Sequence, residues 1–599
     1  MNVTAAEYFF YYFTITPLIR FVLILILSSN KNKPDHERKA RYLVNFGIIV
    51  DITHLIALFI FNKYLVNVNI SGFLHFISNF RVDWNSYSIA YLCFAIGLIS
   101  IVNRFSLFYL HRDSYFYKFF ATIFILELAA SLLILTTSSE SIFIGWELLG
   151  LSSVLLIAFY EHRIAALKNS LTILVIYKIS DVILYSTLII SAYYGIHSYT
   201  AITNNIAICA ILLACLIKSS LFPWVWLPRA MEGPTPSSAI FYGGIATHLP
   251  MFIFLNLWSR STQHDYILIF CCVVIIAIST TITSLLSRQS PDAKNAIAYA
   301  SVTQLGIIYI EILLGFYTFA IMHGIANGVY KSLEFLKSPS LLYQKHYIDK
   351  YRYKITDPTG VHTERLIPLR WRNWVYRLVY NEFILPRTLM NCIRWFLGLY
   401  SSRSNIHTIR NYVCSTLVVL ITFQLIIYYI LKIKLSIYDE YLLIISYIFN
   451  ITAMIYKYKP AHFFVALIIS IAAIYTVLFD HAYFYIANIG WFYTAALIYF
   501  IFIKYYNNIK IENTINFSGR LSKSGLYDLL VLLLGVTIIG VPGLASFLIW
   551  EKLEVLLLSK SPDLIIYSFF ILSLNTIVFF RFYYANFLGT NEVHKIYQI

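Results

Sequence analysis

Long apolar segments separated by short polar connections repeat along most of this sequence. Up to residue 336, eleven segments each approach the roughly 20 apolar residues that an α-helix needs to cross a bilayer. They fall at residues 8–28, 42–62, 87–103, 119–136, 139–160, 169–194, 201–222, 235–257, 265–287, 295–315 and 317–336. The pattern predicts an all-α polytopic membrane protein.

The pattern continues after a polar stretch. Four further spans are expected at residues 414–436, 440–457, 461–479 and 484–503, and two more near the C-terminus, one of them interrupted by Pro542. The expected total is about 17 spans. We divide the chain into parts 1–118 (spans 1 to 3), 119–257 (spans 4 to 8), 258–344 (spans 9 to 11), 345–412 (a basic segment), 413–505 (a four-span insertion) and 506–599 (the broken span 12 and span 13).

Composition and charge agree with this class. Apolar residues make up 59% of the 599 residues and charged residues only 12%. The net charge of +16 could indicate nucleic acid, but the basic residues lie in the connections between spans, where they signal topology. Connections after odd-numbered spans are the more basic, so they are expected on the matrix or cytoplasmic side and the N-terminus on the opposite side. No nucleic-acid partner is expected.

The cysteines and the N-terminal sequence bear on possible cysteine-based sites and on the origin of the protein. None of the seven cysteines forms a C-x-x-C pair, so neither a disulfide framework nor an iron–sulfur site is indicated. The sequence begins without an Arg-rich presequence and is rich in Phe, Tyr, Ile, Asn and Lys. This usage is typical of an AT-rich organellar genome, although a bacterial origin stays open.

A lysine inside an expected span is followed by four prolines. Lys218 lies in the span at 201–222, and the prolines occupy positions 223, 228, 234 and 236, where the helix would otherwise continue. Proline removes a backbone donor and breaks a helix, and irregular backbone at membrane depth needs protein or a water-filled cavity around it. The stretch predicts a functional broken helix. The alternative is a proline-rich loop after a lysine whose ammonium reaches the membrane surface.

Carboxylates also occur inside expected spans. Glu147 lies in the span at 139–160, where an unpaired charge costs on the order of 2.5–3.5 kcal/mol. It is expected to be protonated or paired with a lysine of another helix, which could be a purely structural ion pair. Lys178 and Asp181 share one helix face at spacing i, i+3 and could satisfy each other. Further polar candidates inside spans are Asp51, His54 and Glu127.

Three polar residues form a stripe in the span at 317–336. His323, Asn327 and Lys331 recur every four residues and therefore lie on one helix face. A lone histidine is more often a hydrogen-bonded core residue than a proton carrier. A stripe of three polar side chains instead favours a role in organising a line of water.

Several motifs resemble those of one family. W-L-P-R-A-M-E-G-P-T-P at 226–236, F-I-G-W-E-L-L-G-L-S-S at 143–153 and D-A-K-N-A-I-A-Y-A-S-V-T-Q-L-G at 292–306 are similar to signatures of the antiporter-like, proton-pumping membrane subunits of respiratory NADH:ubiquinone oxidoreductase, most of all the chain 5 branch. The resemblance covers residues 80–345 well and 526–590 weakly. It implies an antiporter-like helical bundle with inverted repeats and broken helices.

The resemblance also implies roles for individual residues. Glu147 and Lys218 take the positions of the family's coupled acid and lysine, and proton transfer onward falls to Lys331 and His323. The K-I-S-D run that holds Lys178 and Asp181 stands where chain 5 usually has N-R-x-G-D. The G-V-P-G break at 540–543 resembles helix 12 of the family and makes Glu551 or Lys552 the expected outlet.

The sequence lacks three histidines that the family usually has. The family usually has histidine where this chain has Tyr242, so that site is either lost or replaced by His248. Asn327 replaces the second histidine of the stripe, and Trp224 replaces a histidine before W-L-P. Asparagine binds water but takes no proton, so water must bridge there.

The expected function is proton translocation in the membrane arm of that complex, in the mitochondrial inner membrane and with the N-terminus on the intermembrane-space side. The complex uses NADH, FMN, iron–sulfur clusters and ubiquinone, of which this chain is expected to bind none. Expected partners are membrane-arm subunits, especially the chain 4-like neighbour, and lipids including cardiolipin. Two alternatives are a subunit of a multi-subunit cation/proton antiporter and a degenerate scaffold subunit that does not pump.

Overall fold

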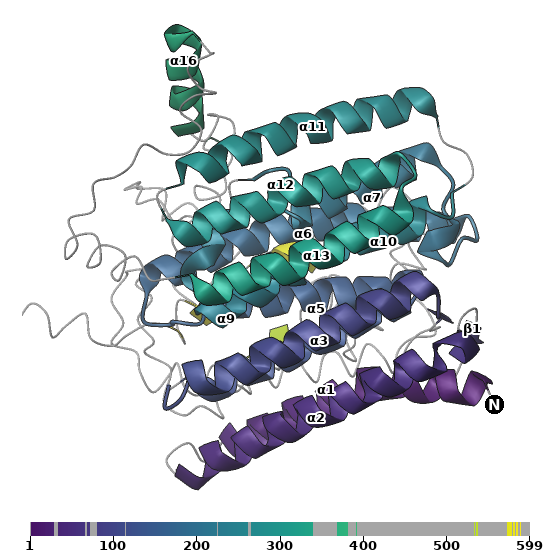
Figure 1. Cartoon of the computed structure of the whole chain (residues 1–599), viewed down its shortest axis with the longest axis vertical. Coiled ribbons are helices and arrows are strands. Elements are labelled where there is room, and N and C mark those ends of the chain that lie inside the picture. The colour runs from purple at the N-terminus through teal and green to yellow at the C-terminus, as the bar shows by residue number, and fades with distance from the viewer. Residues whose placement is uncertain are drawn as a thin grey trace, which may run out of the picture. The chain divides into compact units, whose positions relative to one another are not determined.

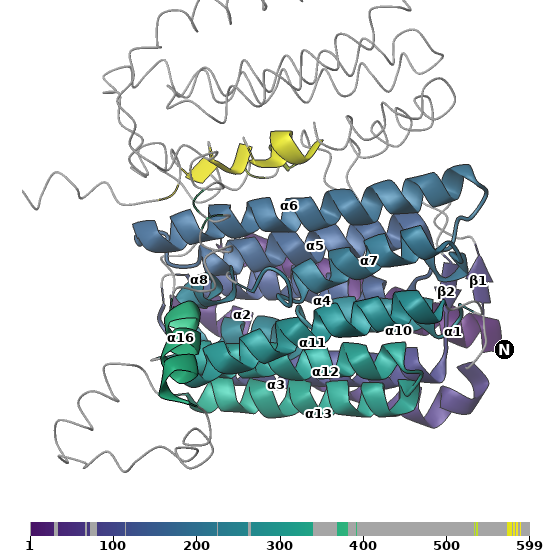
Figure 2. The same cartoon turned by 90° about the horizontal axis from the view of Figure 1, so that it is seen from above.

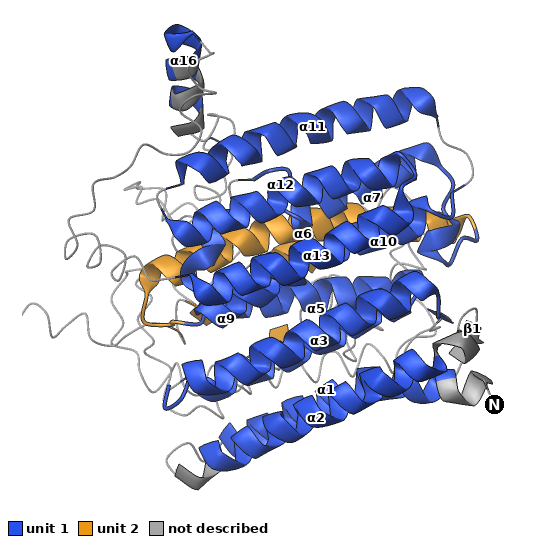
Figure 3. Ribbon diagram, viewed as in Figure 1, with its two compact units in different colours: residues 1–159, 195–392 blue, residues 160–194, 393–599 orange. Residues whose placement is uncertain are grey.

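A computed structural model describes much of the first 380 residues and short pieces beyond them. The described residues are 2–28, 34–65, 69–71, 81–113, 115–224, 226–261, 265–290, 292–338 and 368–380, with short pieces between 388 and 588. The chain divides into two compact units, coloured separately in Figure 3. Unit 1 holds Met1–Phe159 and Gly195–Cys392, and unit 2 holds Tyr160–Tyr194 and Ile393–Ile599.

Unit 1 is built from long helices (Figure 1). They are α1 Asn2–Ser28, α2 Pro34–Leu65, α3 Ser86–Tyr109, α4 Phe116–Leu135, α5 Ser139–Ile157, α7 Asn205–Lys218, α10 Leu249–Trp258, α11 Tyr266–Gln289, α12 Ala293–Leu313, α13 Tyr317–Lys337 and α16 Leu369–Tyr380. In unit 2 the described long helix is α6 Ile164–Tyr193, and the Ser170 hydroxyl on it lies 3.1 Å from the Tyr584 hydroxyl. Each of the eleven spans predicted up to residue 336 overlaps helix in the structure.

Nine of the described helical segments are long and apolar enough to cross a membrane, which confirms a polytopic membrane protein. Two predicted spans fall short of that standard for physical reasons. The 14 residues of α7 rise only about 21 Å, less than the hydrocarbon core of about 30 Å. The polar stripe of α13 lowers its hydropathy. The four-span insertion at 413–505 and the break near Pro542 lie outside the described residues, so the total of 17 spans stays a prediction.

A short β-ribbon joins α2 to α3, which the sequence analysis did not predict. Strand β1 (Asn69–Ser71) pairs antiparallel with β2 (Arg81–Asp83), and Ile70 stands opposite Val82. Val82 also bridges to Thr136 just after α4. The ribbon therefore fixes a connection at one end of the helices, and the all-α prediction needs this local correction.

Packing separates inner from outer helices within unit 1. Most residues of α4 and α5 are buried, as is the whole hydrophobic window of the segment ending in α10. By contrast, α1, α2 and α11 expose large apolar side chains such as Phe46, Phe59 and Phe270. Figures 1 and 2 show α11, α12 and α13 side by side, and contacts join each to the next. Exposed apolar faces on the outer helices are expected in a protein surrounded by lipid.

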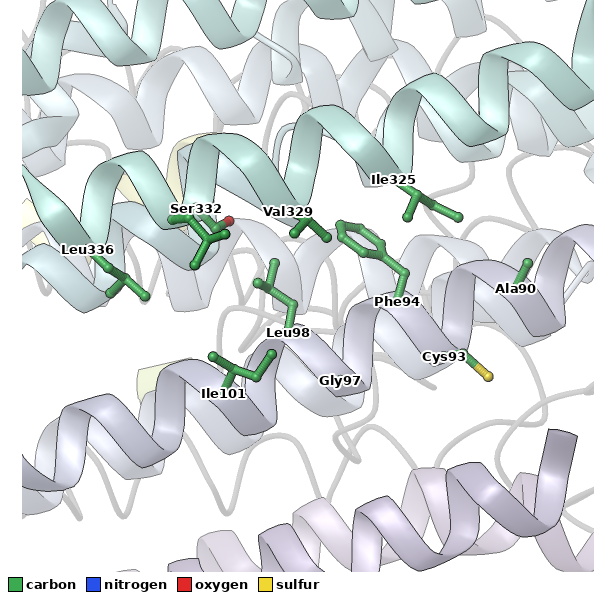
Figure 4. Close-up of a pocket in the computed structure, with 11 residues that line it drawn as sticks. Ala90, Cys93, Phe94, Gly97, Leu98, Ile101, Ile325, Val329, Ser332 and Leu336 are labelled. Carbon is green, nitrogen blue, oxygen red and sulfur yellow. The ribbon is translucent and has the colours of Figure 1, made fainter.

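An apolar cavity of about 380 Å³ lies between α3 and α13 (Figure 4). Gly97 of α3 lines it, and a Cβ added there would meet no atom within 4 Å. At Gly328 of α13 the helices approach closely, and an added Cβ would lie 2.4 Å from Cζ of Phe94. The two glycines thus differ in their tolerance of a methyl group.

We expect Gly328→Ala to destabilise the protein by about 1–3 kcal/mol, because the Phe94 ring must shift to make room. Gly97→Ala serves as the control and should leave stability nearly unchanged. Thermal unfolding of the two variants in detergent measures the difference. Equal melting temperatures for both variants and the wild type would contradict the packing described between α3 and α13.

Candidate functional site

The predicted helix break after Lys218 is present. Lys218 is the last residue of α7, and Ser220 follows with a positive φ of 62°. The chain then forms short turns before the next long helix, namely α8 Trp226–Arg229, η2 Ala230–Glu232, α9 Thr235–Ser238 and the π-helical turn η3 Ala239–Gly244. The prolines predicted to break the rod lie within this irregular stretch or at its edges.

The backbone of the break is hydrogen-bonded rather than left open. The amides of Leu221 and Phe222 both donate to the carbonyl of Leu216, at 3.0 and 3.3 Å. The indole of Trp226 donates to the carbonyl of Ile217 at 3.2 Å. The last turn of a helix leaves such carbonyls without partners, so these bonds make an interrupted helix tolerable at membrane depth.

Lys218 lies deep inside unit 1, only 2% exposed. Its ammonium donates to the backbone carbonyl of Trp146 at 2.7 Å and lies 4.3 Å from the centre of the Trp146 ring. Both contacts stabilise a positive charge, the second through the electron-rich face of the indole. The burial argues against a lysine that reaches the membrane surface.

Glu147 occupies the position next to this contact. It is the residue after Trp146 on α5 and is 7% exposed. The Lys218 ammonium therefore lies against the helical turn that carries Glu147, and the direct pairing that the motif resemblance implies stays a prediction. Sequence reasoning gave Trp146 no role, although it belongs to the W-E motif; its carbonyl and ring hold the lysine.

His248 forms a second polar centre, fully buried just before α10. The Asn327 amide of α13 donates to His248 Nε2 at 3.0 Å, and Thr247 Oγ1 lies 3.3 Å from Nδ1. An amide nitrogen only donates, so Nε2 accepts and the ring is neutral in this arrangement. Two of the positions singled out from sequence therefore meet across helices.

His323 joins two residues that the sequence analysis did not assign. Its Nδ1 lies 2.9 Å from a carboxylate oxygen of Glu311, and its Nε2 lies 3.2 Å from the amide oxygen of Gln304. Both partners are on α12. Glu311, a carboxylate inside an apolar span, was a signal that could have been read from the sequence in the same way as Glu147.

Lys331 completes the stripe on α13. Its ammonium binds the Glu334 carboxylate one turn along the same helix at 2.8 Å. Large side chains elsewhere around α13, including Phe319, Met322 and Tyr330, are exposed. Asn327 is buried, so the stripe has one buried member between two partly buried ones, His323 and Lys331.

Of the other candidates, Lys178 and Asp181 lie in unit 2, whereas Asp51, His54 and Glu127 lie in unit 1. On α6 the Lys178 ammonium lies 3.4 Å from the Asp181 carboxylate, so the two residues do pair at the i, i+3 spacing, and their role in proton translocation stays a prediction. Both residues are buried. Glu551 and Lys552 lie outside the described residues, so the outlet stays a prediction.

Comparison with known proteins first indicates a class of membrane protein. Residues 137–356 match the family described as "NADH:quinone oxidoreductase/Mrp antiporter, TM". This match spans the W-E motif, the broken helix and the α13 stripe. The matched segment is thus similar to the antiporter-type membrane domains that this family describes.

Curated relatives then point to one branch of the class. The NADH-ubiquinone oxidoreductase chain 5 of Aspergillus niger is 27% identical over 330 residues, covering 51% of this chain and 49% of the relative. Chain 5 of Wickerhamomyces canadensis is 30% identical over 277 residues, covering 44% and 43%. These similarities confirm the resemblance found in the motifs. The matched region spans about half the length of the curated relatives.

Two solved structures are similar to part of the chain. One is the membrane-bound sulfane sulfur reductase, an archaeal respiratory membrane complex, with 15% identity and a TM-score of 0.47 over 54% of this chain and 69% of that chain. The other is the Mrp complex from Dietzia sp. DQ12-45-1b, with 18% identity and a TM-score of 0.46 over 54% and 37%.

Proposed function

We propose that this chain is a proton-translocating subunit of the membrane arm of NADH:ubiquinone oxidoreductase, driven by quinone reduction elsewhere in the complex. The observation that carries the proposal is the buried Lys218 ammonium, held at a helix break against the turn of Glu147. An ionisable residue inside a membrane protein is by default functional, and breaks in helices are where transporters place their sites. NADH, FMN, iron–sulfur clusters and ubiquinone would be bound by other subunits.

The proposed switch is the Glu147 and Lys218 pair. While the ammonium is near, the carboxylate stays ionised; when the lysine moves away, the low dielectric favours protonation of Glu147. Return of Lys218 then expels that proton. Moving one charge against the membrane potential requires about 2.3 kcal/mol per 100 mV, which is within the range of a buried charge interaction.

A series of hydroxyl and imidazole groups lies between the helix break after Lys218 and the helices α12 and α13. The Ser219 hydroxyl, next to Lys218, lies 2.9 Å from the hydroxyl of buried Tyr309 on α12. The His248 and His323 centres lie on the elements that follow. We propose that water links these groups, and that Lys331 and an outlet at Glu551 or Lys552 receive the proton.

A cation/proton antiporter subunit is the second candidate, because the matching family description includes Mrp antiporters. Purification of the full chain from mild-detergent extracts separates the two. A membrane-arm subunit should co-elute with flavin, iron–sulfur chromophores and NADH oxidation by an artificial acceptor. Elution with membrane subunits alone, without flavin, would favour the antiporter.

We also propose contact between α16 and anionic lipid such as cardiolipin. The helix exposes Arg370 and Arg377 as well as Trp371 and Trp374, whose rings are 6.0 Å apart. Arginine beside tryptophan suits the boundary between headgroups and acyl chains. Other proposed partners are the membrane-arm subunits, including the chain 4-like neighbour.

The proposed location is the mitochondrial inner membrane, with the N-terminus on the intermembrane-space side. Residues 337–412, which include α16, then face the matrix. Protease added to mitoplasts from outside should leave this segment intact, and detergent should make it cleavable. Cleavage of this segment without detergent would show that the orientation is the opposite of the one proposed.

A further inference from the structure

A second buried ionic cluster lies in unit 1 on α1, α2 and α4. Arg20 is 7% exposed and makes a two-pronged contact with Asp51, at 2.6 and 2.7 Å between the guanidinium nitrogens and the two carboxylate oxygens. Paired parallel bonds of this kind are the strong geometry for an arginine and a carboxylate. Asp51 is therefore fully engaged as an ionised partner.

Glu127 shares the same guanidinium. Its Oε1 lies 3.3 Å from Arg20 Nη1, whereas its buried Oε2 has no hydrogen-bond partner. The residue is only 1% exposed. Backbone geometry makes room for the arginine, because a Cβ added at Gly47 of α2 would lie 3.1 Å from Arg20 Cζ. The helices are thus packed to hold the guanidinium, and one carboxylate oxygen of the cluster, Oε2 of Glu127, has no hydrogen-bond partner.

Among the residues that the structure describes, the surroundings of the cluster supply no second arginine or lysine. Asp51 and Arg20 are the charged groups that act on Glu127. Lys118, on the same helix as Glu127, donates to the Ala158 carbonyl, and Arg104 of α3 donates to Asn45. The helix α10, which also contacts α4, carries no charged residue.

Three aromatic side chains line the Asp51 side of the cluster. Tyr12 donates its hydroxyl to Asp51 Oδ1 at 2.8 Å. The imidazole of His54 is stacked on the Tyr12 ring with centroids 3.5 Å apart. The Tyr8 hydroxyl lies 2.8 Å from Nε2 of His54, and Nδ1 of His54 lies 2.8 Å from the Val50 carbonyl oxygen. Both ring nitrogens of His54 are engaged by these contacts.

Charge balance decides the state of Glu127. Arginine does not lose its proton in proteins, so the guanidinium contributes one positive charge. Two ionised carboxylates would leave one buried negative charge unbalanced, which is strongly unfavourable. Asp51 already holds the guanidinium with both oxygens, so the extra proton belongs on the Oε2 of Glu127. A metal cation is disfavoured beside the guanidinium.

We propose that Glu127 is a proton-binding site, separate from Glu147 and Lys218, which holds one proton in the resting protein. Asp51 and Arg20 are the fixed charges that define it. The inference needs only that these helices lie in a membrane, so it stands or falls independently of the proposed pump function.

Infrared spectroscopy of the purified full-length protein in its native assembly tests this proposal. The wild type should show a carbonyl band of a protonated, buried carboxylic acid, which Glu127→Gln removes. The control is Glu37→Gln, which removes the carboxylate bound by His111 and Arg41 and should leave that band in place. Identical bands in the wild type and in Glu127→Gln would overturn the proposal.

The stability of two variants provides a second, independent test of the proposal. Glutamine resembles a protonated glutamic acid, so Glu127→Gln should leave the amount of folded chain in membranes unchanged. Asp51→Asn removes the ionised partner of Arg20 and should reduce that amount severalfold, since breaking a buried pair is strongly destabilising. An equal loss in both variants would show that Glu127 is also ionised and would overturn the proposal.

Discussion

Replacing Glu147 by glutamine should abolish most NADH-driven quinone reduction while leaving electron transfer to an artificial acceptor intact. Glutamine keeps the shape of the side chain but can neither lose nor gain the proton. The flavin lies in another part of the proposed complex, so NADH oxidation there does not depend on Glu147. Because the two reactions are tightly coupled in a pump, blocking the proton step should stop the quinone step as well. The expected loss is at least about tenfold, corresponding to about 1.4 kcal/mol or more in the barrier.

The same helix offers a control for this variant. Glu140 lies in the first turn of α5, nearly two turns from Glu147 and away from the Trp146 contact. Glu140→Gln should retain the coupled rate. Native electrophoresis must show that both variants assemble normally. If the Glu147→Gln complex assembles and keeps wild-type coupled activity, Glu147 and Lys218 are not the switch. That result would favour the alternative of a scaffold subunit that does not pump.

His248 should be the second most sensitive position. We expect both His248→Gln and His248→Phe to lower the coupled rate severely. Glutamine can still bond to Asn327 but cannot carry a proton, and phenylalanine fills the buried space without either property. Loss in both variants assigns proton transfer to the imidazole. The measurement is the coupled rate of assembled complex, normalised to artificial-acceptor activity.

The control for His248 is Tyr242→Phe, at the position where the family usually has histidine. Its ring lies 6.2 Å from that of Trp226, a packing contact that phenylalanine preserves. This variant should keep nearly full activity. If His248→Gln were active and only His248→Phe inactive, then the hydrogen bond to Asn327, and not proton transfer, would be the function of this residue.

Sequence reasoning placed the helices well because lipid exposure imposes one simple requirement, a long apolar run. It also located the break after Lys218, since prolines at membrane depth allow no continuous helix. The W-E motif supplied Glu147, and the structure brings its turn to Lys218. The role of Trp146 was not predictable, because it depends on a backbone carbonyl.

Contacts between distant segments explain the other omissions. Asp51 and Glu127 were recognised as polar residues inside spans, but their partner Arg20 lies 107 residues before Glu127. One sequence without pairing information cannot say which buried charges meet. Glu311 could have been recognised as a carboxylate inside an apolar span, but its contact with His323 on the next helix was not predictable from one sequence. The β1 and β2 ribbon is too short for its alternation to be visible.

The ratio of protons moved to electrons transferred tests the central proposal most directly. The complex should be reconstituted into closed vesicles with wild-type chain, with Lys218→Gln and with the charge-retaining Lys218→Arg. We predict that Lys218→Gln lowers proton translocation severely in fully assembled complex, and that Lys218→Arg retains more of it. An unchanged proton-to-electron ratio in assembled Lys218→Gln complex would contradict proton translocation through this chain.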